Sequence, residues 1–210
     1  MNSEKKEIIN QAYSFAKKCH KKQKQVSGKP YFEHPNEVAE LLKKWNQEVE
    51  VIVAGYLHDV VEDCSISLKE LKNRFGKRVA FLVDGMSFVI KNIKGKPKKD
   101  MEATYKKFIK YSKKDPLLIL VKLADMISNI PNIHIKSNRE FTINKSYPRS
   151  MTFWIPLMVA VGLNGSAMKI KKEFNKYTNQ KIKSTLSDYI SKKDITLIKN
   201  KISKIKPKEI

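Results

Sequence analysis

The chain has 210 residues, of which 41% are hydrophobic and 30% are charged, so it is long enough to bury a sizeable core in one domain. Its 43 Lys and Arg residues against 21 Asp and Glu residues give a formal net charge of +22, which favours anionic ligands such as nucleotides, nucleic acids or acidic headgroups. The N-terminus lacks an apolar core of signal-peptide length, and the longest apolar run, Phe153 to Leu163, is too short to span a bilayer, which excludes an integral membrane protein. We therefore expect a cytoplasmic protein without a membrane partner.

Apolar residues recur at helical spacing in the first third of the chain and predict three helices. The three stretches cover residues 8–19, 38–45 and 49–61. Ser67, with Glu70 three residues later, is typical of a helix N-cap, and Gly76 is typical of a helix end. Another apolar helical stretch follows at 79–86.

Residues 91–99 interrupt the helical pattern and predict a loop, because six of these nine positions are Lys or Gly. Helical spacing resumes at 101–111. Asp115 and Pro116 then suit the N-cap and first position of a strongly apolar helix that extends to residue 130. Alternating apolar patterns typical of strands are missing, so we expect an all-α fold.

The last part of the chain differs in composition from the rest. Residues 165–210 contain 13 Lys and four acidic residues, which predicts a solvated, amphipathic helical segment. We therefore divide the chain into a main domain at 1–164 and a Lys-rich helical C-terminal extension at 165–210. The two cysteines, Cys19 and Cys64, lack CxxC spacing and predict no disulfide framework, as in a reducing compartment.

Four residues with the chemistry of metal ligands lie in helical contexts. His58 and Asp59 are adjacent inside an apolar run, where burial is costly unless something binds them. His34 precedes Pro35, a residue suited to the first helical position, and Asp125 lies in the later apolar helix. A single buried His is more often a core residue, but the set of two imidazoles and two carboxylates predicts a site for Mn, Fe, Ni, Co or Zn.

Glu62 and Asp63 follow His58 and Asp59 at a spacing of four, which would place all four on one side of a single helix. Beside a metal pair, these two carboxylates predict a catalytic or water-orienting role. A bound metal lowers the pKa of its water and neutralises charge on a phosphoryl oxygen, so the pattern indicates a phosphate-ester hydrolase. Asn129, four residues after Asp125, suits either a substrate contact or a hydrogen bond at the helix end.

Four segments in this order resemble the hydrolase domain of the Rel/Spo alarmone enzymes, and most closely their small stand-alone hydrolases. The segments are Gly28-Lys29-Pro30-Tyr31-Phe32-Glu33-His34-Pro35, Leu57-His58-Asp59-Val60-Val61-Glu62-Asp63, Phe75-Gly76 through Leu82-Val83-Asp84-Gly85-Met86-Ser87, and Val121-Lys122-Leu123-Ala124-Asp125 with Asn129. The resemblance covers about residues 10–132.

This resemblance implies an all-helical HD-domain bundle in which His34, His58, Asp59 and Asp125 hold Mn²⁺. It also implies that Glu62 and Asp63 position or activate the attacking water. The family reaction removes pyrophosphate from the 3′ position of guanosine tetra- or pentaphosphate and leaves GDP or GTP. We expect this chain to degrade the alarmone and not to make it, because it has no room for a synthetase domain.

Only some of the family's substrate-contacting residues have counterparts in this sequence. The family has an Arg-Lys pair before Ser-Gly, with the Arg against guanine, but the stretch 23–28 contains no Arg, and Lys24 is only a displaced substitute. Lys94 and Lys98 lie where the small hydrolases have phosphate-facing lysines. Arg149 is spaced from Phe153 like an Arg-Tyr pair that lines the nucleotide pocket in those enzymes.

Two alternatives to an alarmone hydrolase stay open. One is an HD-domain phosphohydrolase that acts on another nucleotide or a dinucleotide, because the guanine contacts are altered. The other is a basic nucleic-acid-binding protein with a vestigial metal site. The intact metal and catalytic set argues against the second, so we do not expect nucleic acid as the primary partner.

Overall fold

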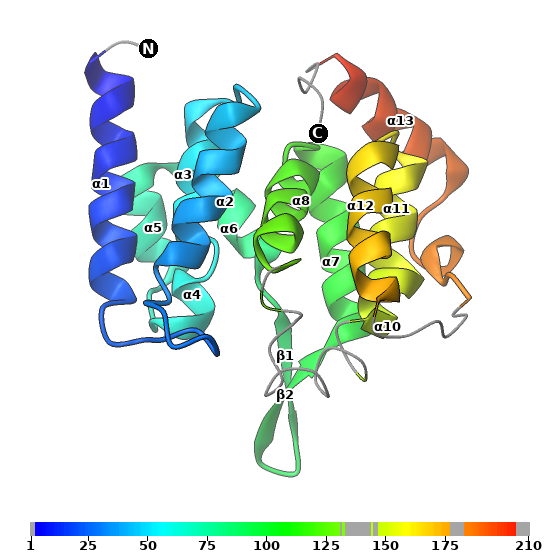
Figure 1. Ribbon diagram of the computed structural model, residues 1–210, viewed down its shortest axis with the longest axis horizontal. Coiled ribbons are helices and arrows are strands. Elements are labelled where there is room, and N and C mark those ends of the chain that lie inside the picture. The colour runs from blue at the N-terminus through cyan, green and yellow to red at the C-terminus, as the bar shows by residue number, and fades with distance from the viewer. Residues whose placement is uncertain (1–2, 131, 133–143, 145–146, 177–182, 205–210) are drawn as a thin grey trace.

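The computed structural model describes residues 3–130, 132, 144, 147–176 and 183–204. Over these residues the protein is mainly helical, with one two-stranded hairpin (Figure 1). This confirms the predicted all-α class. Within the same ranges, no helix is both long enough and apolar enough to cross a bilayer.

The first half of the molecule contains six helices, one of which is a single turn. They are α1 (Ser3–Cys19), α2 (Glu33–Lys44), α3 (Val49–Leu57), α4 (Val60–Asp63), α5 (Leu68–Phe75) and α6 (Lys77–Met86). The hairpin strands β1 (Val89–Ile93) and β2 (Lys96–Asp100) follow. The second half contains α7 (Met101–Lys114), α8 (Leu118–Ser128), α10 (Tyr147–Arg149), the π-helix η4 (Ser150–Trp154), α11 (Ile155–Ala160), α12 (Asn164–Asn175), the 3₁₀ turn η5 (Leu186–Asp188) and α13 (Lys192–Ser203).

The core is built around α3 and α8, which are apolar on nearly every side. All residues of α3 from Val51 to Leu57 are buried, and so are most residues of α8. A helix of this composition is stable in water only when other helices surround it. Accordingly, α1, α2 and α6 pack against α3, and α8 packs against both α2 and α3 (Figure 1).

The predicted helix over 49–61 is interrupted at its functional residues. Helix α3 ends at Leu57, and α4 begins at Val60, so His58 and Asp59 form the junction between two helices. The His58 imidazole contributes to this break, because its Nδ1 lies 2.8 Å from the Gly55 carbonyl oxygen and competes for an acceptor of the last helical turn. The expectation of a single continuous helix was therefore wrong.

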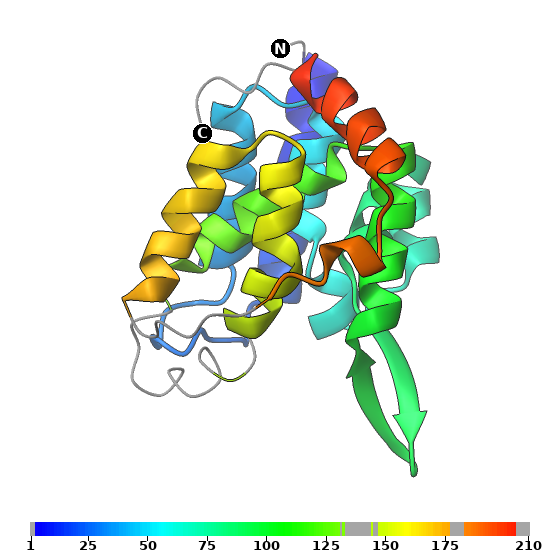
Figure 2. The ribbon, with the colours of Figure 1, turned by 90° about the vertical axis from the view of Figure 1, so that its right-hand side faces the viewer.

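The predicted loop at 91–99 was also wrong, because these residues belong to the β1–β2 hairpin. Lys94 (φ 52°) and Gly95 (φ 77°) both have positive φ, as a two-residue type I′ turn requires. The register pairs Ile93 with Lys96 and Val89 with Asp100. The hairpin projects from the helical body (Figures 1 and 2), so its side chains are mostly exposed and show no apolar alternation.

The C-terminal segment contributes to the packed interior. Helix α12 packs against α11 and α8, and α13 packs against α7 (Figure 2). Ile170 and Phe174 of α12 and Ile198 and Ile202 of α13 are buried, while most lysines of the two helices are exposed. The boundary at residue 164 stays a prediction.

We predict that Gly55→Ala destabilises the protein by about 1–3 kcal/mol, because overpacking displaces the α2–α3 crossing. A Cβ at Gly55 would lie 2.7 Å from Leu42 Cδ1 and 3.3 Å from Ala39 Cα of α2. Helix propensity alone would favour alanine by about 0.8–1 kcal/mol. Urea unfolding followed by circular dichroism measures the difference, and a more stable variant would contradict the close packing.

Candidate active site

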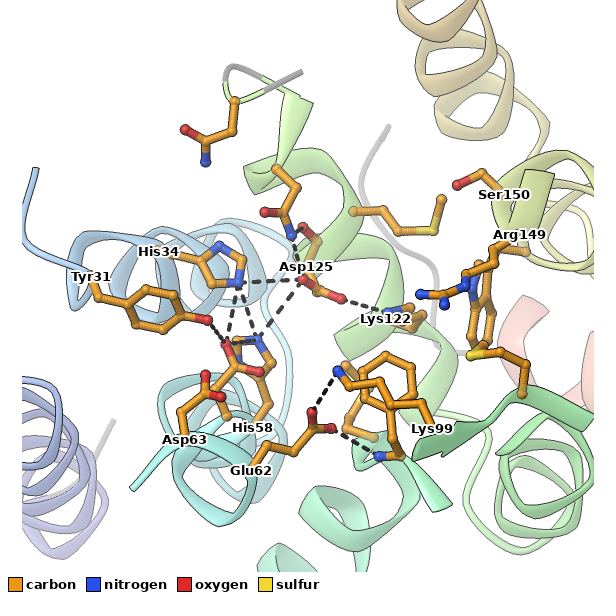
Figure 3. A pocket seen from close by; sticks show the side chains of 18 of the residues that line it. Tyr31, His34, His58, Glu62, Asp63, Lys99, Lys122, Asp125, Arg149 and Ser150 are labelled. Carbon is orange, nitrogen blue, oxygen red and sulfur yellow. Dashed lines mark hydrogen bonds and ion pairs between the residues drawn. The ribbon is translucent and has the colours of Figure 1, made fainter. Parts of the chain in front are cut away.

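A cavity of about 520 Å³ lies between the α2–α4 segment and the second half of the molecule (Figure 3). Its walls come from α2, the α3–α4 junction, the β1–β2 hairpin, α8 and η4. The volume falls in the range of small-molecule sites. The metal-ligand and catalytic residues predicted from the sequence all line this cavity. They are His34, His58, Asp59, Glu62, Asp63 and Asp125.

Two imidazoles converge at the bottom of the cavity. His34 Nε2 and His58 Nε2 lie 3.3 Å apart, and both residues are buried. The other nitrogen of each ring points away from this meeting point. His58 Nδ1 lies 2.8 Å from the Gly55 carbonyl oxygen, and His34 Nδ1 lies 3.0 Å from Ser128 Oγ.

These outer contacts assign the tautomers. The Gly55 carbonyl only accepts hydrogen bonds, so His58 carries a proton on Nδ1. Ser128 donates its hydroxyl proton to Glu37 Oε2 at 2.7 Å, so its oxygen accepts from His34 Nδ1. In the neutral form of each ring, which is the form that binds a metal, Nε2 then has a lone pair directed into the cavity.

Carboxylate oxygens complete the cluster. Asp59 Oδ2 lies 3.1 Å from His58 Nε2 and 3.6 Å from His34 Nε2. Asp125 Oδ1 lies 3.3 Å and 3.9 Å from His34 Nε2 and His58 Nε2, respectively. The remaining oxygen of Asp125 accepts a hydrogen bond from Lys122 Nζ at 2.7 Å, while Asn129 Nδ2 donates to Oδ1 at 2.7 Å.

The donor set fits a divalent metal. Donor atoms that share one ion at bonds of about 2.0–2.2 Å lie about 3.0–3.5 Å apart. The distances from the two imidazole Nε2 atoms to the carboxylate oxygens of Asp59 and Asp125 run from 3.1 to 3.9 Å. Donor atoms of His34, His58 and Asp59 all lie within 4.8 Å of one another. Two buried lone pairs facing each other beside two carboxylates need a positive charge between them, which a metal ion supplies.

The mutual interactions of the cluster shift the pKa values of its members. Burial alone would lower the pKa of His58, but Asp59 and then Asp125 outweigh it and raise that pKa to about 9. Burial alone would raise the pKa of Asp59 and Asp125. The pKa of Asp59 is nonetheless lowered by His58, and the pKa of Asp125 is lowered by Lys122 and His34. Both carboxylates are therefore ionised at neutral pH.

Glu62 and Asp63 lie on the same side of the cavity as the cluster (Figure 3). The Glu62 carboxylate accepts hydrogen bonds from the Phe88 backbone N–H at 2.9 Å and from Lys99 Nζ at 3.3 Å, which fixes its orientation. The pKa of Asp63 is raised by burial and by the negative charge of Asp59. Glu62, whose orientation is fixed by two donors, thus lies next to Asp63, whose pKa is raised.

The opposite wall of the cavity is cationic. Figure 3 shows Lys99, Lys122 and Arg149 facing the side that holds Tyr31 and Asp63. The two lysines rest on aromatic rings, which hold their positions. Lys99 Nζ lies 3.4 Å from the centre of the Phe88 ring, and Lys122 Nζ lies 4.8 Å from a Trp154 ring centre.

Only some of the residues predicted to bind substrate line the cavity. Asn129 and Arg149 line the cavity. Lys24, Lys94 and Lys98 are not among its lining residues; Lys24 lies in an isolated bridge with Pro30, and Lys94 lies in the hairpin turn.

Three side chains at the site were not predicted from the sequence. Tyr31 donates a hydrogen bond to Asp59 Oδ2 at 2.7 Å, and burial together with Asp59 raises the pKa of Tyr31. Lys122 precedes Asp125 by three residues, a spacing that places side chains on one helix face and could have indicated the pair. Lys99 is directed to Glu62 by the hairpin, which the sequence did not predict.

Comparisons with known proteins agree with this geometry. A family model described as an HD domain matches residues 12–161. A guanosine-3′,5′-bis(diphosphate) 3′-pyrophosphohydrolase of Aquifex aeolicus is 32% identical over 94% of this chain and 29% of its own length. A protein of the same description from Vibrio cholerae is 38% identical over 59% of this chain and 18% of its own. The chain therefore spans less than a third of the length of these two relatives.

A solved structure of a metazoan ortholog of SpoT, described as hydrolysing ppGpp, has a TM-score of 0.54 and 20% sequence identity. The alignment covers 81% of this chain and 93% of that one, and at this identity it supports the fold alone. The family match spans the whole metal cluster, Glu62 and Asp63. The chain belongs to the HD-domain family.

Proposed function

We propose that this chain is a Mn²⁺-dependent hydrolase that removes pyrophosphate from the 3′ position of guanosine 3′,5′-bis(diphosphate), leaving GDP, or GTP from the pentaphosphate. The observation that carries the proposal is a metal-ligand cluster with two carboxylates beside it and a cationic wall opposite, all in one cavity. The relatives that carry this activity in their names support the choice of substrate.

In this proposal His34, His58, Asp59 and Asp125 hold the metal. Two nitrogen and two oxygen donors suit Mn²⁺ and other divalent transition metals better than Mg²⁺. When bound, the metal lowers the pKa of a coordinated water and neutralises charge on a phosphoryl oxygen. Ser128, Gly55, Lys122 and Asn129 hold the ligand side chains in place.

Glu62 and Asp63 handle the attacking water. We assign the proton-accepting role to Asp63, because burial and the negative charge of Asp59 raise its pKa. Glu62 orients the water through a carboxylate that Lys99 and the Phe88 N–H already fix. In this assignment Asp63 removes a proton from the attacking water, and Glu62 holds that water in position.

The cationic wall binds the phosphates of the substrate. Arg149 and Lys99 extend into the cavity, and the planar guanidinium of Arg149 suits bidentate contact with a phosphate. Asn129 contributes an amide at the same wall. Lys24, Lys94 and Lys98 lie outside this lining, and we assign them the weaker role of attracting the substrate through their charge.

The base contact in this chain differs from the one that the family resemblance implies. No Arg is present in the stretch 23–28, so the guanine cannot stack on a guanidinium plane there. Instead, Gln25 Oε1 accepts a hydrogen bond from Asn132 Nδ2 at 3.3 Å, and Asn132 lines the cavity. This difference favours as runner-up an HD-domain phosphohydrolase of another nucleotide or a dinucleotide. In either case we expect a cytoplasmic enzyme with a nucleotide substrate.

Product analysis tests the substrate directly. We expect the Mn²⁺-loaded protein to convert guanosine tetraphosphate into GDP and pyrophosphate, and a chelated control to release neither. A panel of ordinary nucleotides and dinucleotides is incubated in parallel, and products are separated by anion-exchange chromatography. Turnover of another panel member without turnover of guanosine tetraphosphate would replace the alarmone by that nucleotide. Chelator-insensitive binding of arbitrary RNA with steep salt dependence, without any turnover, would favour the nucleic-acid-binding alternative.

Two substitutions separate metal binding from water activation. Asp59→Ala should lose bound Mn²⁺ and all turnover, because it removes a ligand of the cluster. Glu62→Gln should keep its Mn²⁺ but lower kcat by about 10²–10⁴-fold, because the amide replaces one accepting carboxylate oxygen by a donor and so misorients the attacking water. Metal content by atomic emission and steady-state kinetics give both readouts.

Glu102→Gln is the matched control, since this exposed carboxylate forms an ion pair with Lys106 on the surface of α7 and does not line the cavity. Its metal content and kcat should equal those of the unmodified protein. Full turnover in Glu62→Gln would remove Glu62 from the mechanism, and normal metal content in Asp59→Ala would remove Asp59 from the cluster.

The pH dependence of metal binding follows from His58. Its pKa of about 9 means that the metal-free protein carries a proton on this imidazole at pH 7, and binding must release it. Mn²⁺ affinity should therefore rise by up to about tenfold per pH unit between pH 6.5 and 8.5, and level off above the pKa. Calorimetric titrations in buffers of different ionisation enthalpy count the released protons, and an affinity independent of pH would contradict this assignment.

A further inference from the structure

The two cysteines, which are 45 positions apart in the sequence, meet in the structure. Cys19 is the last residue of α1, and Cys64 caps the C-terminal end of α4 (Figure 1). The two thiols line the same cavity and lie close enough to affect each other's pKa, and both are free and half-buried. A disulfide needs two such side chains in direct contact with little backbone movement.

A polar network connects Cys64 to the neighbouring catalytic segment. Cys64 Sγ lies 3.4 Å from His20 Nδ1, and that nitrogen lies 2.6 Å from Gln23 Oε1. Gln23 Nε2 donates to the backbone oxygen of Asp63 at 2.7 Å and lies 3.9 Å from Cys64 Sγ. Movement of Cys64 is therefore transmitted to the backbone of Asp63.

The thiols are open to a small oxidant. Cys19 and Cys64 both line a second cavity of about 750 Å³, separate from the active-site cavity. Glu70 and Arg74 also line it and form an ion pair with each other at 3.0 Å, so the positive charge that suits a small anionic disulfide such as oxidised glutathione comes from Lys18. The aromatic contact of Phe15 with Phe75, whose ring centres lie 5.5 Å apart, fixes the wall behind the thiols.

We propose that Cys19 and Cys64 form a reversible intramolecular disulfide by exchange with a small disulfide. One thiol loses its proton, and its thiolate attacks a sulfur of the oxidant, which forms a mixed disulfide and releases one small thiolate. The second cysteine, also deprotonated, attacks the protein sulfur of that mixed disulfide and releases the other small thiolate. The protein loses two protons and two electrons, and the oxidant becomes two thiols.

Two features predict how this pair behaves. Burial, followed by the neighbouring charges of Cys19 and Asp63, raises the pKa of Cys64 to about 12, so exchange is slow at neutral pH and accelerates as the pH rises. The S–S bond, at about 2.05 Å, is shorter than a thiol–thiol hydrogen bond, so its formation draws Cys64 toward α1. We expect this shift to move Asp63 and lower kcat, a consequence that rests on the proposed function.

The test uses the full-length folded protein and oxidised glutathione. Peptide mapping under non-reducing conditions should yield one cross-linked species that contains Cys19 and Cys64, lacks two hydrogen atoms and carries no glutathione. Cys19→Ser and Cys64→Ser are matched controls, each of which should retain one glutathione on the remaining cysteine because nothing displaces it. A reducing agent should restore the starting mass in every case.

Glutathione retained on both cysteines of the unmodified protein, a link between two chains, or thiols that react only after unfolding would each overturn the proposal. The unmodified protein decides this even where a serine variant misfolds. Turnover of guanosine tetraphosphate is then measured before and after oxidation. A disulfide without a fall in kcat would overturn only the effect on Asp63, and a reduced, Mn²⁺-loaded protein without turnover would overturn the proposed function but not the disulfide.

Discussion

The structure depends on the convergence of two imidazole nitrogens, His34 Nε2 and His58 Nε2, at 3.3 Å in a buried site. Helices α2, α3 and α8 supply the partners that lock both rings in this orientation. Gathering two imidazoles and two carboxylates in a buried site is unfavourable in free energy. The apolar packing of α3 and α8, which are buried on almost every side, offsets it. The arrangement of potential metal ligands therefore exists only while the core is folded, and a change that disrupts this packing would also disrupt the site.

Charge is separated across the cavity by different structural elements. The acidic side lies on the short α4 segment, and the cationic side comes from the hairpin, α8 and α10. The Lys99–Glu62 ion pair, at 3.3 Å, joins the two sides at the cavity rim. Under the proposed function, a polyphosphate bound between them would compete for Lys99, which would couple substrate binding to the orientation of Glu62.

The sequence predicted the parts of this site that local spacing determines. Helical periodicity and the His58-Asp59 pair identified the cluster, because two adjacent polar ligands are costly to bury in an apolar run unless an ion binds them. The sequence did not predict the contacts that depend on how distant segments pair in the folded structure. In a strand, neighbouring side chains face opposite ways, so the hairpin register directs Lys99 and not Lys98 to Glu62, and no sequence pattern carried that register. The contact between Cys19 and Cys64 likewise depends on how α1 packs beside α4.

The surface charge and the cavity charge have separate roles. The formal net charge of +22 is spread over the chain, and the lysines of α12 and α13 lie on exposed faces. Exposed charges are screened beyond about 8 Å at physiological ionic strength, so they cannot fix a phosphate inside the cavity. Under the proposed function they would accelerate the approach of an anionic substrate instead, while Lys99, Lys122 and Arg149 would act at contact distance. The selectivity of the site must therefore come from the few residues that line the cavity, and the large positive charge of the chain says little about which anion it accepts.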